Sequence, residues 1–291
     1  MKSDIIKIMK KLIFSTILIS SLLYSCSAPQ SSYDTQEKQD GKFYYEMGIS
    51  SLNTGNNAQA IAYLLEAIKS YKTPESYNAL ALAYQFSGEY KKAEEIFKEG
   101  LSRYPDNPEL LTNLGVLYAM TSREKEAISY LEKAISNPTY SKKDRAYYNL
   151  GLIYRNLGNE TLFLENINKS LMYNSNFVDA YIVLGDHYYE KYSQTGSREF
   201  LKTALLYYLK AINLGYNSGE IYYKIGKIYI ILGEKELAKY YLEKALKVVS
   251  DKDPMKNEIK NLLINIAEGK TEGLRERRDN SENVLKDLLR K

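Results

Sequence analysis

Residue types that commonly do chemistry are scarce in this chain. Cys26 is the sole cysteine and His187 the sole histidine among 291 residues. One thiol cannot form an internal disulfide, and one histidine without nearby cysteines does not make a metal site. Carboxylate pairs such as Glu94 and Glu95 stand among lysines, which is typical of solvated helix faces. We therefore expect no enzyme activity, no catalytic residue, no cofactor and no metal, and a groove-lining or partly buried His187.

The segment before Cys26 has the pattern of a secretory signal. Four lysines and one aspartate occur in residues 1–25, and an apolar run extends from Leu12 to Tyr24. That run is shorter than the roughly 20 residues of a membrane-spanning helix. The order of a basic start, an apolar run and small residues predicts a signal peptide over residues 1–25. The alternative to a signal peptide is a buried helix of the mature protein. Within the signal interpretation, Met9 could be the true start.

Cys26 stands at the end of this segment in the order Leu23-Tyr24-Ser25-Cys26. These residues resemble the lipobox of bacterial lipoproteins. The resemblance implies that Cys26 is acylated, for example with palmitate, and becomes the first residue of the mature protein. Ser27 implies, by the same resemblance, the periplasmic side of the outer membrane. An ordinary signal peptide with an incidental thiol is the alternative.

The region after the signal segment is close to electrically neutral. The chain carries a net +4, of which residues 1–25 supply +3. Binding to nucleic acid depends on a concentration of positive charge, which this balance does not supply. We expect no nucleic-acid partner. Residues 26–40 are polar and almost free of apolar residues, which predicts a flexible tether.

From residue 41 onward a pattern of about 34 residues repeats. A small residue follows a large apolar one in six places, and a tyrosine follows three residues later in five of them. The small residues are Gly48, Ala81, Gly115, Gly151, Gly185 and Gly226. The pattern resembles the tetratricopeptide repeat (TPR), a helix-turn-helix unit. The fold class we predict is all-α, with a TPR solenoid of six repeats over residues 41–250.

Some segments depart from this pattern. Phe163 stands where alanine is expected, which predicts a splayed hairpin in repeat 4. Repeat 5 has an insertion over Tyr192–Arg198, which we expect to be a surface insertion. Asp253 and Pro254 form a helix-start signal, because an aspartate can cap a helix that has proline in its first turn. Residues 251–291 are therefore expected to form a C-terminal capping helix and a charged tail.

In TPR proteins the first helix of each repeat lines a groove, so the resemblance implies a partner-binding set on these helices. The set is Tyr45, Ile49, Leu52, Asn78, Gln85, Thr112, Tyr148, Arg155, Tyr189 and Tyr223. Repeat 1 is the most apolar part of it. This patch could receive a peptide of a protein partner, or the tether could fold back over it. We expect no small-molecule substrate.

The combination of signal, lipobox and six repeats resembles the type IV pilus biogenesis lipoproteins, or pilotins. The resemblance also rests on Asn-Leu-Gly at Asn113–Gly115 and Asn149–Gly151, and on the long connector Asn137–Arg145. It implies a membrane-anchored scaffold that binds the pilus secretin and helps it reach the outer membrane and assemble. The alternative is a generic TPR lipoprotein that recruits cell-wall enzymes or proteases.

Overall fold

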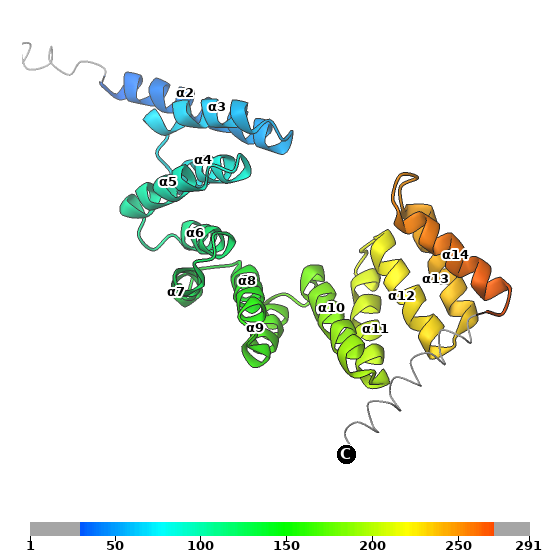
Figure 1. The fold of residues 1–291 in the computed structure, drawn as a ribbon. Helices are drawn as coiled ribbons and strands as arrows, with labels where there is room; N and C mark the ends of the chain where they lie inside the picture. Colours follow the sequence, from blue (N-terminus) through cyan, green and yellow to red (C-terminus); the bar gives the residue numbers. More distant parts are fainter. Residues whose placement is uncertain (1–29, 271–291) are drawn as a thin grey trace, which may run out of the picture. The chain divides into compact units, whose positions relative to one another are not determined.

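The computed structural model describes residues 30–270, and this part of the chain is all-helical, with thirteen helices and no strand (Figure 1). The chain divides into two compact units, Met1–Pro138 and Thr139–Lys291. We call them unit 1 and unit 2. The predicted signal peptide, Cys26 and the charged tail beyond residue 270 lie outside the described residues.

Twelve helices pair into six antiparallel hairpins, as the repeat pattern predicts. Unit 1 contains α2 (Gln30–Asn53), α3 (Asn57–Ser70), α4 (Pro74–Phe86), α5 (Tyr90–Arg103), α6 (Pro108–Met120) and α7 (Glu124–Ser136). Unit 2 contains α8 (Lys143–Asn156), α9 (Glu160–Tyr173), α10 (Val178–Thr195), α11 (Arg198–Asn213), α12 (Gly219–Leu232), α13 (Lys235–Val248) and α14 (Met255–Ala267). The all-α fold class is confirmed.

Capping residues fix where several helices begin. Thr73 and Asn107 accept a hydrogen bond from the backbone N–H three residues later, and a proline follows each of them. This order suits a helix start, because the first turn has unpaired N–H groups and tolerates proline. At α14 the Asp253 carboxylate accepts from the N–H of Met255 at 2.9 Å, as its position before Pro254 predicted. Ile259 of α14 then packs in the core of repeat 6, so α14 is the predicted cap.

The core lies between the two helices of each hairpin and, within each unit, between successive hairpins. Gly185 shows why a small residue is needed, because a Cβ there would lie 2.5 Å from the ring of Tyr208 on α11. The second helices also carry small residues, which are fully buried at Ala60, Ala93, Ala127, Ala204 and Ala238. Small residues on both helices therefore allow the close packing of each hairpin.

The predicted splaying of repeat 4 was wrong. A Cβ at Gly151 of α8 would lie 2.6 Å from Ile167 of α9, so this hairpin is as tightly packed as the others. Phe163 is 1% exposed and belongs to a buried cluster that includes Val183 and Leu184 of α10. The large ring therefore fills the space between hairpins and does not force its own hairpin apart.

The predicted insertion in repeat 5 is largely helical. It lengthens α10 to 18 residues, whereas α8 and α12 have 14. Gly196 ends the helix with φ 73°, a left-handed conformation that glycine adopts without strain. Tyr192, inside the predicted insertion, is 3% exposed and packs with Leu201 and Ile221. No glycine or proline precedes Gly196 in this stretch, which explains why the helix continues.

The predicted tether also differs from the structure, because α2 begins at Gln30 and includes residues 30–40. Residues 36–40 are exposed. The Ser70 hydroxyl on α3 donates to the carbonyl of Glu37 at 2.8 Å, so this extension contacts repeat 1. Polar composition suggested a flexible segment, but glutamine, glutamate and lysine are also good helix formers. A proline before α2 and the absence of glycine until Gly41 allow the helix.

Candidate functional site

The first-helix face of unit 1 combines apolar and amide side chains. On α2, Tyr45, Ile49 and Leu52 are half-buried, and the ring of Tyr45 lies 5.7 Å from that of Tyr71. On α4, the half-buried Asn78 accepts a hydrogen bond from Asn113 of α6 at 2.6 Å. The apolar residues on α2 are thus partly accessible, whereas the Asn78 side chain is hydrogen-bonded to the next repeat.

Two residues predicted for partner binding in unit 1 are buried. Gln85 and Thr112 are 8% and 5% exposed. The Gln85 amide donates to the sulfur of Met120 on α6 at 3.1 Å, while its carbonyl oxygen has no hydrogen-bond partner. Sequence position predicted the helix face of these residues but not their burial, which for Gln85 comes from the contact with α6. Phe86 and Met120 are more accessible, at 61% and 53%.

The corresponding face of unit 2 is more highly charged. Asp186 of α10 accepts hydrogen bonds from Tyr208 and from Lys224 of α12, both at 2.7 Å. Burial opposes the charge on Lys224, but hydrogen bonds to Asp186 and Glu220 raise its pKa. Burial and the hydrogen bond to Asp186 raise the pKa of the Tyr208 hydroxyl. This set of hydrogen bonds and ion pairs holds repeats 5 and 6 together.

The remaining predicted residues in unit 2 differ in their accessibility. Tyr148 and Tyr189 are half-buried, and the Tyr148 ring packs 5.0 Å from Phe177. Tyr223 is 8% exposed and donates to Glu258 of α14, so the capping helix occupies its hydroxyl. Arg155 is half-buried and pairs with Glu190 of α10 at 3.0 Å. Tyr223 is thus part of the C-terminal packing and offers little surface to a partner.

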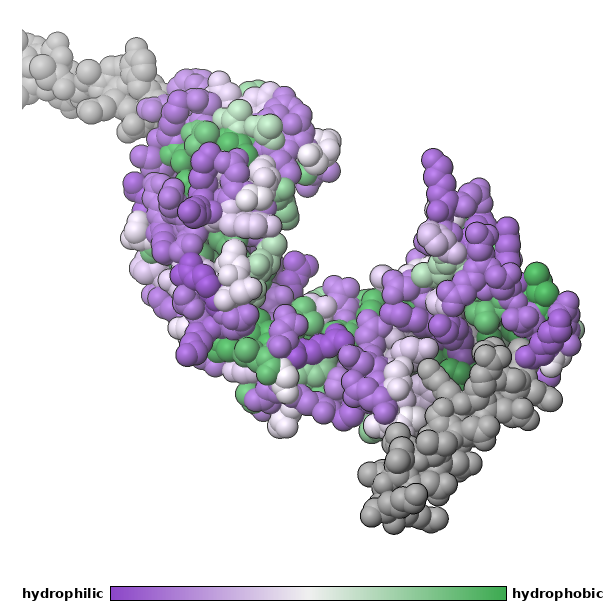
Figure 2. Space-filling model, in the orientation of Figure 1, coloured by the Kyte–Doolittle hydropathy of each residue, from purple (hydrophilic) through white to green (hydrophobic). Residues whose placement is uncertain are grey.

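Figure 2 shows that the visible surface is mostly hydrophilic, with separate apolar patches.

His187 lies between repeats 4 and 5. It is 9% exposed, its Nε2 lies 3.2 Å from Glu160, and its ring packs against Phe163 at 5.0 Å. Burial lowers its pKa, and Lys191 and Arg155 act in the same direction, while Glu160 opposes them. The neutral imidazole therefore fills a junction between hairpins, as expected for a partly buried histidine.

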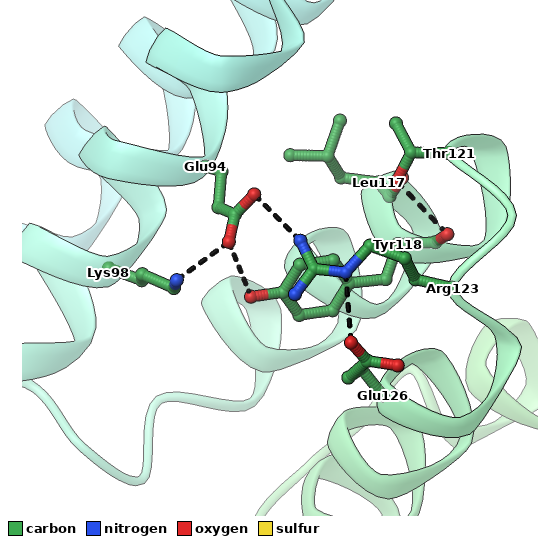
Figure 3. A network of polar contacts seen from close by, with 7 residues as sticks. All are labelled: Glu94, Lys98, Leu117, Tyr118, Thr121, Arg123 and Glu126. Carbon is green, nitrogen blue, oxygen red and sulfur yellow. Dashed lines mark hydrogen bonds and ion pairs between the residues drawn. The ribbon is translucent and has the colours of Figure 1, made fainter.

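Unit 1 has a different polar junction, between repeats 2 and 3 (Figure 3). Glu94 of α5 accepts from the Tyr118 hydroxyl at 3.0 Å and from Arg123 at 2.9 Å. Arg123 also binds Glu126 and lies 4.0 Å over the Tyr118 ring. Burial alone would raise the pKa of Glu94, but hydrogen bonds from Lys98, Arg123 and Tyr118 lower it. The network therefore stays charged at neutral pH.

Within residues 30–270 no three histidine, cysteine or acidic side chains come together in a way that could hold a metal ion. In the same range no helix is both long and apolar enough to cross a bilayer.

Family models for the tetratricopeptide repeat match more than half of the chain. One model matches residues 73–139, and a second matches residues 41–73, 144–177 and 219–248. The chain belongs to the tetratricopeptide repeat (TPR) family. The matched ranges omit residues 178–218, which contain repeat 5 with its lengthened α10.

Type IV pilus proteins are among the relatives of this TPR chain. The type IV pilus assembly protein PilF of Pseudomonas aeruginosa is 27% identical over 158 residues, which cover 54% of this chain and 63% of PilF. A solved structure of Pseudomonas aeruginosa PilF superposes with a TM-score of 0.63 at 22% identity, over 78% of this chain and 99% of that one. The structure of PilW, described as a widely conserved type IV pilus biogenesis factor, gives 0.61 at 24% identity, over 77% and 98%. At these identities the structures show a shared fold.

TPR matches also extend to proteins of other kinds. The human protein O-mannosyl-transferase TMTC1 is 25% identical over 208 residues, which are 72% of this chain but only 23% of that protein. The similarity therefore covers less than a quarter of TMTC1 and carries no activity over to this chain.

Proposed function

We propose that this chain is a lipid-anchored TPR scaffold that acts in type IV pilus assembly. The observation that carries the proposal is the similarity to PilF, which extends over 158 residues. The resemblance to the pilotins, given by the signal segment, the lipobox and six repeats, supports the same assignment. The chain spans about 63% of the length of PilF.

The anchor in this proposal is a lipid on Cys26. Leu23 and Ser25 occupy the aliphatic and small positions of the lipobox, and the apolar run before them suits a signal peptide. One acyl chain binds a membrane only marginally, whereas several give a stable anchor, so we assign more than one chain to Cys26. Ser27 favours the outer membrane by resemblance to the lipoprotein sorting pattern, so we assign the protein to the periplasmic side of that membrane.

The binding surfaces are the first-helix faces of the two units, and the partner is a protein. Half-buried aromatic and aliphatic side chains such as Tyr45, Ile49 and Leu52 suit an apolar segment of that partner. The pilus secretin is the partner that the pilotin resemblance implies. In this proposal the protein acts by binding, and its one histidine serves the packing between repeats 4 and 5.

Two experiments test the proposal separately. Cys26→Ala should abolish lipid labelling and membrane fractionation while the helical circular dichroism spectrum stays the same; a variant that still fractionates with membranes would refute the anchor. Cys26→Ser should behave as Cys26→Ala does, since only a thiol is acylated in lipoproteins.

For the partner, crosslinked cells should yield the secretin with the wild-type protein, and deletion should reduce secretin multimers. Recovery of cell-wall hydrolases or proteases in its place would support a generic adaptor.

A further inference from the structure

A cleft lies between repeats 4 and 5, where the lengthened α10 faces α8 and α9. The cavity has a volume of about 260 Å³. One wall comes from the last part of α10, with Glu190, Lys191 and Gln194. The opposite wall comes from Arg155 of α8 and Phe163 of α9. Gln194 belongs to the part of α10 that the insertion in repeat 5 adds, so the insertion contributes to the cleft.

The basic groups of the cleft are held more firmly than the acidic ones. Arg155 is 35% exposed and lies 5.9 Å from the centre of the Phe163 ring. Lys191 is 28% exposed and lies 5.1 Å from the centre of the Phe200 ring. A cation over the face of an aromatic ring is attracted electrostatically to the ring, and this attraction favours the observed positions of both side chains.

The acidic partners are closer to solvent. Glu190 is 55% exposed and Glu160 is 47% exposed. Glu160 is bound by both His187 and Lys191, whereas Glu190 pairs with Arg155 across the cleft. A partly exposed ion pair contributes little to stability, so a long exposed side chain can leave it at small cost. Glu190 is therefore the replaceable member of the cleft.

We propose that this cleft binds a carboxylate side chain of a protein partner, which takes the place of Glu190 on Arg155. The guanidinium offers two parallel N–H donors to a carboxylate, which is a strong and directional contact. Lys191 and Gln194 stand on the facing wall as further donors, and Phe163 offers an apolar surface to the methylene groups. The volume accommodates one acidic side chain. This inference adds a second contact point to the proposed scaffold and depends on neither the lipid anchor nor the secretin.

His187 makes the test direct, because it is the only histidine of the chain and it lines the cleft. Its imidazole C–H signals can be followed by NMR in the full chain held in detergent micelles. The probe is a short peptide with blocked termini and one aspartate, and the matched neutral probe has asparagine instead. We expect the aspartate peptide alone to shift the His187 signals saturably. Glu190→Gln should tighten its binding about fivefold, and Arg155→Gln should weaken it about tenfold or more.

Matched controls use charges outside the cleft. Arg145→Gln on α8 and Glu199→Gln on α11 alter exposed side chains and should leave binding unchanged. Unchanged binding in Arg155→Gln, or the absence of any shift in both the wild type and Glu190→Gln, would overturn the proposal. Free glutarate serves as a second probe; if it bound more tightly than the aspartate peptide, a small carboxylate and not a partner side chain would be the ligand. Loss of the secretin interaction would affect none of these measurements.

Discussion

The two units join successive hairpins by different means. In unit 1, α5 meets repeat 3 through the ion pair of Glu94 with Arg123 and the hydroxyl of the buried Tyr118, which donates to Glu94. In unit 2, α9 meets α10 through the buried pair Phe163 and His187. The position two residues after the first small residue is Leu117 in repeat 3 but His187 in repeat 5. The junction between successive repeats can therefore be formed either by a charged hydrogen-bond network or by a buried contact that includes a titratable histidine.

The largest expected effect comes from removing the ring that fills the unit 2 junction. Phe163→Ala should lower the free energy of unfolding of unit 2 by about 3–4 kcal/mol, because it leaves a cavity in a buried cluster. Hydrogen-exchange protection should fall in α9 and α10 while α5 and α6 keep theirs. Phe43→Ala, at a site 58% exposed, is the control and should cost about 0.5 kcal/mol or less. Equal losses of protection in both units would contradict the separation of the two junctions.

A smaller effect is expected at the unit 1 junction. Tyr118→Phe keeps the buried ring and removes the hydroxyl that donates to Glu94. The free energy of unfolding of unit 1 should fall by about 1.5–2 kcal/mol, as for the loss of one hydrogen bond to a charged acceptor. Urea unfolding with exchange protection in α5 and α6 measures it. Tyr130→Phe, whose ring lies 5.4 Å from that of Tyr118, removes a hydroxyl outside this network and should have less effect.

The smallest effect, and the one that distinguishes the junctions most clearly, is the response to pH. Burial lowers the pKa of His187 below the ordinary 6.5, while Glu160 opposes the shift and Lys191 and Arg155 reinforce it. Between pH 6.5 and that lower value the unfolded chain binds more protons than the folded one, so stability must fall as pH falls. Above pH 6.5 the histidine is neutral in both states and has no effect.

Exchange protection of α9 and α10 should therefore decrease between pH 7.5 and pH 5.5 more than that of α5 and α6. NMR titration of the single histidine gives its pKa directly. His187→Gln keeps a hydrogen-bonding group beside Glu160 and should remove the extra pH dependence. An unchanged pH response in that variant would show that another group is responsible.

The repeat pattern predicted the helix pairs because small residues at a fixed spacing can only be explained by close helix contact. It could not predict where Phe163 points, since the ring reaches a cluster formed by a different repeat. It also placed Gln85, Thr112 and Tyr223 on the correct helices without showing that these side chains are buried, Gln85 against α6 and Tyr223 against α14. Glu190, Lys191 and Gln194 were missed as site residues, although the longer spacing in repeat 5 marked the place where α10 departs from the pattern.

The helical start of unit 1 sets a distance. Residues 30–40 of α2 rise about 1.5 Å each, so they span roughly 16 Å, and the part over residues 36–40 is exposed. A disordered segment of that length would sample many end-to-end separations, whereas a helix holds one. For a protein attached to a membrane through Cys26, the part of α2 that precedes the contact of Glu37 with α3 would therefore act as a spacer that holds repeat 1 away from the lipid headgroups.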